Sequence, residues 1–149
     1  MRTSVFEAVQ QFDRPLASVF PFFADARNLE KITPDWLRFQ ILTGSTIEMR
    51  AGANIEYRIR IRGIPVRWRT EISVWEPPHR FVDRQIRGPY RLWIHEHTFA
   101  EAGGVTTMRD RIEYAVPGGE IVRRLLVAPD IERIFDYRRI TLAKAFAAV

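Results

Sequence analysis

One nine-residue stretch limits the fold of this chain more than any other feature. In residues 54–62, NIEYRIRIR, large apolar side chains alternate with charged or strongly polar ones over the whole stretch. Successive side chains of a β-strand point to opposite faces, so this alternation predicts a strand with one buried face and one face in water. Strands of this kind belong to antiparallel sheets with a solvated outer face. The chain is therefore expected to contain such a sheet.

Turn signals divide the rest of the chain into short runs. Residues 3–12 predict a first strand, and Pro15 suits the first turn of a short helix that Pro21 should kink or shorten. A second short helix is expected over residues 25–32. Between residues 36 and 115, runs of six to eleven residues predict six strands in a meander. The turn signals that separate them are Thr43-Gly44-Ser45, Arg62-Gly63-Ile64-Pro65, Pro77-Pro78-His79, Gly88-Pro89 and Gly103-Gly104.

A long C-terminal helix is expected over residues 130–147, with Pro129 marking its start. Apolar residues recur there at helical spacing and should lie on the sheet: Ile131, Ile134, Phe135, Leu142, Ala145 and Phe146. The predicted order is strand, two short helices, six strands and a long helix. This is an α+β fold in one domain that covers residues 1–149.

Length and composition agree with an ordinary globular domain. The chain has 149 residues, 46% of them hydrophobic, which is enough for one sizeable core. No apolar run approaches the roughly 18 residues that a membrane-spanning helix needs, and the N-terminus lacks a signal-peptide core. A cytoplasmic protein is therefore expected. Because the chain contains no cysteine, disulfides and thiolate chemistry are excluded.

Three stretches resemble a known group of proteins. They are FFADARNLEKITPDWLRF (22–39), VWEPPHRFVDRQIRGPYRLWIHEHTF (74–99) and MRDRIEYAVPGG (108–119). Together with the order of elements, they resemble the START-like helix-grip superfamily, also called SRPBCC, which includes polyketide cyclase-like and pollen-allergen-like proteins, and in particular a small bacterial ligand-binding branch. The resemblance implies a curved, seven-stranded antiparallel sheet around the long C-terminal helix. It also implies a cavity under that helix that binds a small hydrophobic molecule, lipid-like or polyketide-like.

Alternation assigns side chains to the inner face of this sheet. Trp93, His95, His97 and Phe99 share one face of their strand, and the two large aromatic residues direct that face inward. The same reasoning turns Asp83 and Gln85 inward on the preceding strand, and Met108, Asp110, Ile112 and Tyr114 on the following one. Because these strands are neighbours in a meander, two histidines, two aspartates and Gln85 are expected in one patch. The candidate ligand-binding residues are Asp83, Gln85, Trp93, His95, His97, Phe99, Met108, Asp110, Tyr114, Phe135 and Arg138.

This polar patch has three interpretations. It is a satisfied network that fixes the core, or it orients a polar end of the ligand, or it performs acid–base catalysis. In the third case the candidates are His95, His97 and Asp110, which would remove a proton next to a carbonyl in a cyclase or dehydratase reaction. No metal or other cofactor is expected, because strand rise places the two histidines about 7 Å apart, too far for one ion unless the strand bends.

Arg138 and a separate group of five arginines leave further alternatives open. Arg138 interrupts the apolar stripe of the long helix and either reaches Asp110 or a ligand carboxylate, or faces solvent. A nucleic acid or another acidic surface is a second class of partner, through Arg58, Arg60, Arg62, Arg67 and Arg69. Glu56 and Glu71 reduce the positive charge of this surface, and no base-stacking motif accompanies it. Nucleic acid is therefore not the expected partner. A monomer and a homodimer are both compatible with the sequence.

Overall fold

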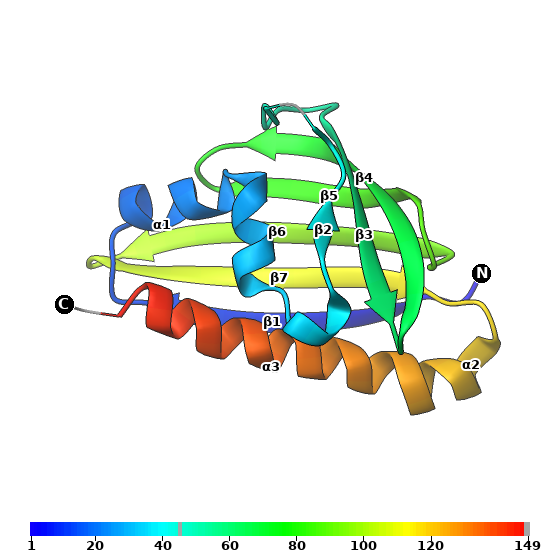
Figure 1. Ribbon diagram of the computed structural model, residues 1–149. Coiled ribbons are helices and arrows are strands. Elements are labelled where there is room, and N and C mark those ends of the chain that lie inside the picture. Colours follow the sequence, from blue (N-terminus) through cyan, green and yellow to red (C-terminus); the bar gives the residue numbers. More distant parts are fainter. Residues whose placement is uncertain (45, 148–149) are drawn as a thin grey trace.

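In a computed structural model, which describes residues 1–44 and 46–147, seven antiparallel strands form one sheet that curves around a long helix (Figure 1). The strands are β1 (Ser4–Phe12), β2 (Gln40–Ile41), β3 (Asn54–Ile61), β4 (Ile64–Glu76), β5 (Arg80–Arg87), β6 (Leu92–Ala102) and β7 (Val105–Ala115). Their order in the sheet is β1-β7-β6-β5-β4-β3-β2. The predicted meander of six strands is therefore confirmed, and β1 extends it by pairing with β7. The expected turn at residues 43–45 lies partly outside the described residues.

The predicted alternation of the strands is present. In β3, Ile55 and Ile59 are buried, whereas Arg58 and Arg60 are exposed. The pairing register places Asp83 of β5 directly opposite His95 of β6, and His97 of β6 opposite Asp110 of β7. The histidines and aspartates therefore lie on three adjacent strands, as the meander required.

Two short helices follow the first strand, as predicted. Helix α1 (Leu16–Phe23) contains Pro21 and buries Val19, Phe20 and Phe23. The second helix, η1 (Ala26–Ile32), has 3₁₀ geometry, and the Asp25 side chain caps it by accepting a hydrogen bond from the Arg27 backbone N–H. A single further turn, η2 (Asp35–Leu37), leads into β2. These segments lie over the concave face of the sheet, the same face that the C-terminal helix crosses (Figure 1).

The predicted long C-terminal helix is present as α3 (Ala128–Ala145), with Pro129 in its first turn, but further helical turns precede it. The helical path begins ten residues before Pro129, at α2 (Gly119–Val122), and continues through a π turn, η3 (Arg123–Val127), into α3. In the π turn the Ala128 N–H donates to the Arg123 carbonyl, five residues back. A proline inside an α-helix lacks an N–H and clashes with the preceding turn. The wider turn directly before Pro129 lets the helix continue through it.

The apolar core lies in two parts between the sheet and the helices. One part surrounds Phe20, Phe23, Phe99 and Leu142 at the end where α1 covers the sheet. The other contains Ile112, Tyr114 and Ile131 under the first half of α3. None of the helices in the described ranges combines the length and apolarity needed to cross a membrane.

Candidate ligand-binding cavity

A cavity of about 460 Å³ lies between the concave face of the sheet and helix α3. Its walls come from β3 to β6, from η1 and η2, and from the first half of α3. Most of the lining is apolar, and typical members are Leu29, Ile32, Ile55, Ile59, Ile72 and Ile134. Clefts of a few hundred Å³ with apolar walls and few polar groups are the usual binding sites for small molecules. The cavity therefore has the size and lining of such a site.

One end of the cavity is formed by packed aromatic rings, of which Trp93 is a candidate predicted from the sequence. Trp68 lies at the centre: it stacks on Tyr57 with ring centroids 5.7 Å apart and meets Trp93 edge-on at 5.2 Å. Tyr90 contacts both tryptophans. Burial raises the pKa of Tyr57 and of Tyr90, so both keep their hydroxyl proton. Alternation would have placed Tyr57 and Trp68 inward, but Tyr90 lies in a loop, where no periodicity applies.

Gln85 does not join the polar patch. Its side chain instead holds the loop between β5 and β6: the amide donates to the Tyr90 carbonyl at 2.7 Å, and its oxygen accepts from the Tyr90 N–H at 3.1 Å. The prediction that Gln85 converges with the histidines is therefore wrong, because a long side chain near the end of β5 reaches the adjacent loop first. Its effect on the cavity is indirect, since it fixes Tyr90.

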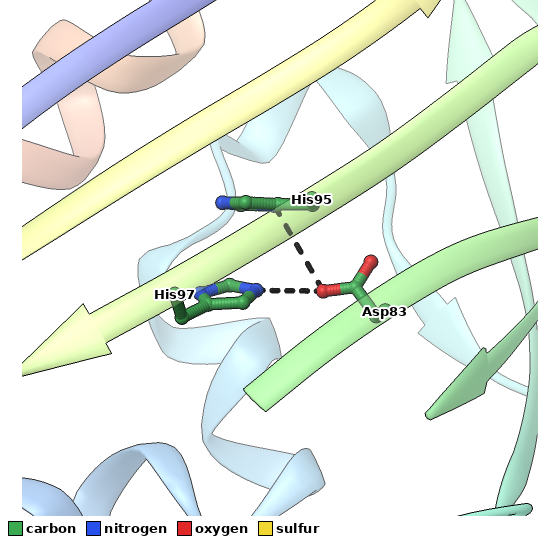
Figure 2. Close-up of side chains that lie close together, drawn as sticks. All are labelled: Asp83, His95 and His97. Atoms are coloured by element: carbon green, nitrogen blue, oxygen red, sulfur yellow. Dashed lines mark hydrogen bonds and ion pairs between the residues drawn. The ribbon is translucent and has the colours of Figure 1, made fainter. Parts of the chain in front are cut away.

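The other four predicted residues do converge. Figure 2 shows the rings of His95 and His97 beside the Asp83 carboxylate. His97 Nε2 lies 2.6 Å from Asp83 Oδ2, and His95 Nε2 lies 2.8 Å from Asp110 Oδ1. The two imidazole rings stack with centroids 3.7 Å apart and planes 23° apart. Asp83, His95 and His97 line the cavity, whereas Asp110 is almost fully buried beneath them.

Arg138 completes this cluster from α3. Its Nη2 lies 3.3 Å from Asp110 Oδ1, and its guanidinium lies 5.3 Å from the ring centroid of Phe135 and 5.9 Å from that of Phe23. Only 7% of the residue is exposed, so the interpretation that it faces solvent is wrong and the pairing with Asp110 is confirmed. Helix α3 is thereby tied to β7 through a buried ion pair next to the cavity.

Both aspartates of the cluster are held in the charged form. Burial opposes ionisation of Asp110, but Arg138 and the two histidines lower its pKa well below the usual range. Burial also opposes ionisation of Asp83, and the hydrogen bond to His97 with the neighbouring positive charges lowers its pKa below the ordinary value. The cluster therefore contains two carboxylates that need cations close by.

The pKa values of the two histidines shift in opposite directions. Burial and the neighbouring His97 lower the pKa of His95, so this imidazole is neutral at pH 7. Burial also works against charging His97, but the carboxylates of Asp110 and Asp83 outweigh it and raise the pKa of His97. When His97 is protonated, it and Arg138 face two carboxylates, and the cluster is close to neutral overall. This balance is what a buried group of charges requires.

The cluster suits hydrogen bonding better than metal binding. One ligand atom from each of Asp83, His95 and His97 lies within 4.8 Å of the others, and the stacked rings show that the 7 Å separation expected from strand rise does not apply to the side chains. An imidazole nitrogen binds a metal through the lone pair in its ring plane. Because the two rings lie nearly parallel, an ion between them would lie outside both planes. Coordination would require at least one ring to rotate out of the stack.

The remaining predicted residues separate into lining and core. Trp93 and Phe135 line the cavity. Phe99 and Met108 belong to the core around α1, and Tyr114 belongs to the core under α3. Alternation predicts correctly that these three side chains point inward, but it does not distinguish a cavity wall from a filled core.

Comparisons with known proteins agree with this architecture. A family model described as "Polyketide cyclase / dehydrase and lipid transport" matches residues 12–135. A Chromobacterium violaceum protein, CV1439, superposes with a TM-score of 0.75 at 13% identity, over 97% of this chain and 98% of that one. Ginseng (Panax ginseng) major latex-like protein 151 gives 0.71 at 10%, over 98% and 99%. A START superfamily protein from Mycobacterium smegmatis gives 0.66 at 11%, over 95% and 98%.

No curated protein matches the sequence. At 10 to 13% identity, the solved structures show the fold alone, which is the START-like helix-grip fold. The family model, in contrast, covers most of the sequence, from the end of β1 to the middle of α3. This chain therefore belongs to the family of polyketide cyclases/dehydrases and lipid transport proteins.

Proposed function

We propose that this protein binds a planar, largely apolar molecule of the polyketide type, with one oxygen-bearing end that accepts a hydrogen bond from Arg138, beside His97 and Asp83. Membership of the family supports ligand binding in a hydrophobic cavity at a general level. The observation that carries the finer proposal is the division of one cavity into an aromatic end and a polar cluster. Flat aromatic walls favour rings over flexible acyl chains, because ring stacking is worth about 0.5–1.5 kcal/mol beyond the buried area.

Arg138 supplies the strongest argument for the oxygen-bearing end. Its guanidinium makes one hydrogen bond among the described residues, to Asp110, and its Nε has no partner. His97 Nδ1 also lacks a well-aligned partner, although Asp110 Oδ1 lies 3.2 Å away. Buried donors without acceptors cost about 1–3 kcal/mol each. A ligand oxygen that accepts from Arg138 would remove part of this cost.

The charge of the cluster favours a neutral oxygen over a carboxylate. The two ionised aspartates already balance Arg138 and the charged His97. A ligand carboxylate would add a third negative charge to a nearly dry site, which costs several kcal/mol unless another proton is bound. A ketone or quinone carbonyl accepts the same hydrogen bond without that cost. We therefore favour a carbonyl group at this end of the ligand.

Native mass spectrometry of freshly purified protein tests the basic proposal, because a ligand from the expression host would appear as a defined mass above that of the denatured chain. Titration with fluorenone and with fluorene then tests the polar end, since these tricyclic molecules differ by one carbonyl oxygen. Trp68 and Trp93 line the cavity, so quenching of tryptophan fluorescence reports binding. A hydrogen bond to a charged group is worth about 1.5–3 kcal/mol, and fluorenone should bind roughly tenfold or more tightly than fluorene.

A charge-balanced variant shows whether Arg138 makes the difference. In Asp110→Asn/Arg138→Met, which removes both members of the buried pair, the two molecules are expected to bind equally. Arg133→Met is the matched control, because Arg133 lies at the cavity edge over Trp36, away from the cluster. If neither molecule binds the wild-type protein and no host ligand is found, the proposed function is wrong. If both bind with equal affinity, only the role of Arg138 is wrong.

A second candidate function is a dehydratase or cyclase. The observation that favours it is the 2.6 Å contact between His97 and Asp83 at the cavity wall, where 20% of the Asp83 side chain is exposed. The raised pKa of His97 favours its protonated form, which can act as a general acid that donates a proton to a leaving hydroxyl group. Asp83 lies beside it and can accept a proton from the carbon next to a carbonyl. Water is then the leaving product.

The β-hydroxyketone that dehydrates to benzalacetone tests this candidate, because formation of the conjugated enone is visible by absorbance. Enzymatic dehydration should fall at least about 100-fold in His97→Asn, whereas His79→Asn should keep the activity. His79 lies at the turn between β4 and β5 and is not part of the cavity lining. A wild-type rate equal to the rate in buffer would contradict the enzyme and leave the binding function in place.

A further inference from the structure

Four large aliphatic side chains are exposed at the end of the molecule where the C-terminal helix begins. They are Ile64 (66% exposed), Ile121 (67%), Leu125 (64%) and Leu126 (41%), and we call them the mouth patch. Ile64 starts β4 directly after its turn with β3, and the other three lie on α2 and η3. Single exposed aliphatic residues are common, but several at one end of a protein indicate an interaction site.

The two segments that carry the mouth patch lie side by side. Figure 1 shows the turn between β3 and β4 next to the first turns of α3, with α2 and η3 at the same end. Arg62 in this turn pairs with Asp130 of α3 at 3.1 Å. Ile61, Arg62 and Gly63 line the cavity together with Asp130 and Arg133. The mouth patch therefore borders the part of the cavity wall that is shared by the hairpin and the helix.

Three of the apolar residues of α2 and η3 lie outside the core. Val122 and Val127 are partly buried, and Val127 packs on the core under α3. Ile121, Leu125 and Leu126 point away from it, although each contributes apolar area that water solvates poorly. The helical segment α2–η3 therefore has one apolar face on the core and another exposed to solvent. The exposed face has no partner among the described residues.

The surroundings of the mouth patch are strongly basic. Residues 58–69 contain five arginines and no acidic residue, and Arg123 and Arg124 lie between the apolar residues of α2 and those of η3. Some of these arginines are paired, Arg67 and Arg69 with Glu56 and Arg123 with Glu120. Arg60 and Arg124 form no ion pair within the described part of the chain. Exposed aliphatic groups among arginines match the interface of an anionic lipid bilayer, which offers both acyl chains and phosphate groups.

We propose that the mouth patch docks this protein on an anionic membrane surface. The aliphatic side chains enter the headgroup region, and the arginines of the hairpin and of η3 contact lipid phosphates. The cavity mouth then faces the bilayer, which gives an apolar ligand a path that avoids water. A second copy of this chain is the less suitable occupant, because the arginines of the two copies would face each other across the interface. The proposal stands on the surface alone and does not require the cavity ligand to be known.

Cosedimentation with vesicles tests the proposal. The wild-type protein is expected to bind vesicles of phosphatidylcholine with phosphatidylglycerol, to bind much less to phosphatidylcholine alone, and to lose affinity as salt is added. Ile64→Asp and Leu125→Asp should each lower the affinity at least tenfold, because a carboxylate replaces an inserted apolar group. Arg60→Gln and Arg124→Gln should each lower it roughly fivefold, for anionic vesicles only.

Ile140→Asp is the matched control. Ile140 is 58% exposed and lies on α3, about 20 Å along the helix from Leu126 by helical rise. Equal loss of binding in Ile140→Asp and Leu125→Asp, or no binding of the wild type to anionic vesicles, would overturn the proposal. So would a dimer in light scattering that Leu125→Asp dissociates, because the patch would then serve a second copy. Thermal melts confirm that the variants fold, and fluorenone titration in solution separates loss of docking from loss of the cavity.

Discussion

The imidazole rings of His95 and His97 lie face to face, with their centroids 3.7 Å apart, and each ring places its Nε2 against a different aspartate. The ring of Phe81 covers the other face of His97 at 4.1 Å, nearly parallel. Two stacked imidazoles do not both carry a positive charge at low cost, since like charges this close repel strongly in a buried site. The stack therefore disfavours two charges, and the carboxylates favour His97 as the ring that is protonated first.

This arrangement predicts opposite titration shifts for two neighbouring histidines. The pKa of His97 should lie above 6.5 and that of His95 below 6.5. The chain has three histidines, so the proton NMR spectrum contains three imidazole Hε1 signals, and His79→Asn assigns one of them. Equal midpoints for His95 and His97 would contradict the predicted division of charge.

The same shifts determine how stability depends on pH. Because the pKa of His97 is higher in the folded than in the unfolded state, its contribution is complete below about 6.5 and is lost as pH rises through the folded value. His95 acts in the opposite direction and loses its contribution as pH falls. His97→Asn should therefore destabilise the protein more at pH 6 than at pH 9. Urea unfolding at both pH values measures this difference, and an unchanged difference would refute it.

Removal of the Asp110 carboxylate should be strongly destabilising. Asp110→Asn leaves the Arg138 guanidinium buried without its counter-ion, which costs about 3–5 kcal/mol. Asp110→Asn/Arg138→Met should recover part of this loss, because both charges are then absent. Glu113→Gln on the same strand is the control, since its pair with Arg111 is half-exposed and long at 3.9 Å. Guanidinium unfolding measures the stability of both variants. Equal midpoints for Asp110→Asn and Glu113→Gln would contradict this prediction.

The cavity and the core should respond differently to substitutions on the same helix. Ile134 lines the cavity, so Ile134→Phe should occupy ligand space and weaken fluorenone binding at least tenfold, with little loss of stability. Leu142 is fully buried in the core, so Leu142→Ala should cost about 2–5 kcal/mol and leave the affinity almost unchanged. Calorimetric melts and fluorescence titrations of both variants measure the two effects. The reverse pattern would show that the space under α3 is not the binding site.

The Gln85 side chain should keep the loop that carries Tyr90 ordered at the aromatic end of the cavity. Gln85→Ala removes two hydrogen bonds to the Tyr90 backbone, each worth about 1 kcal/mol. Hydrogen exchange of the Tyr90 amide is then expected to be at least tenfold faster, because that amide donates to Gln85 in the wild-type protein. Gln40→Ala, which removes an exposed side-chain bond to Arg58, should leave it unchanged. Unaltered exchange at Tyr90 in Gln85→Ala would show that the loop does not depend on this side chain.

Much of the fold could be predicted from the sequence because its signals are local. Alternation identified the inner faces of β3, β5, β6 and β7, and proline and glycine marked most of the boundaries. Pro129 correctly marked the first turn of α3, but no local signal predicted the helical turns of α2 and η3 that precede it.

The sequence by itself determined that Asp83, His95, His97 and Asp110 share one face of adjacent strands, because a period of two residues fixes the direction of every side chain. Only the tertiary structure decided that Arg138 reaches Asp110, that the two imidazoles stack, and that Gln85 binds a loop instead. It also decided which inward residues line a cavity and which fill the core. These outcomes depend on the curvature of the sheet and on the position of α3 across it, and long-range packing sets both.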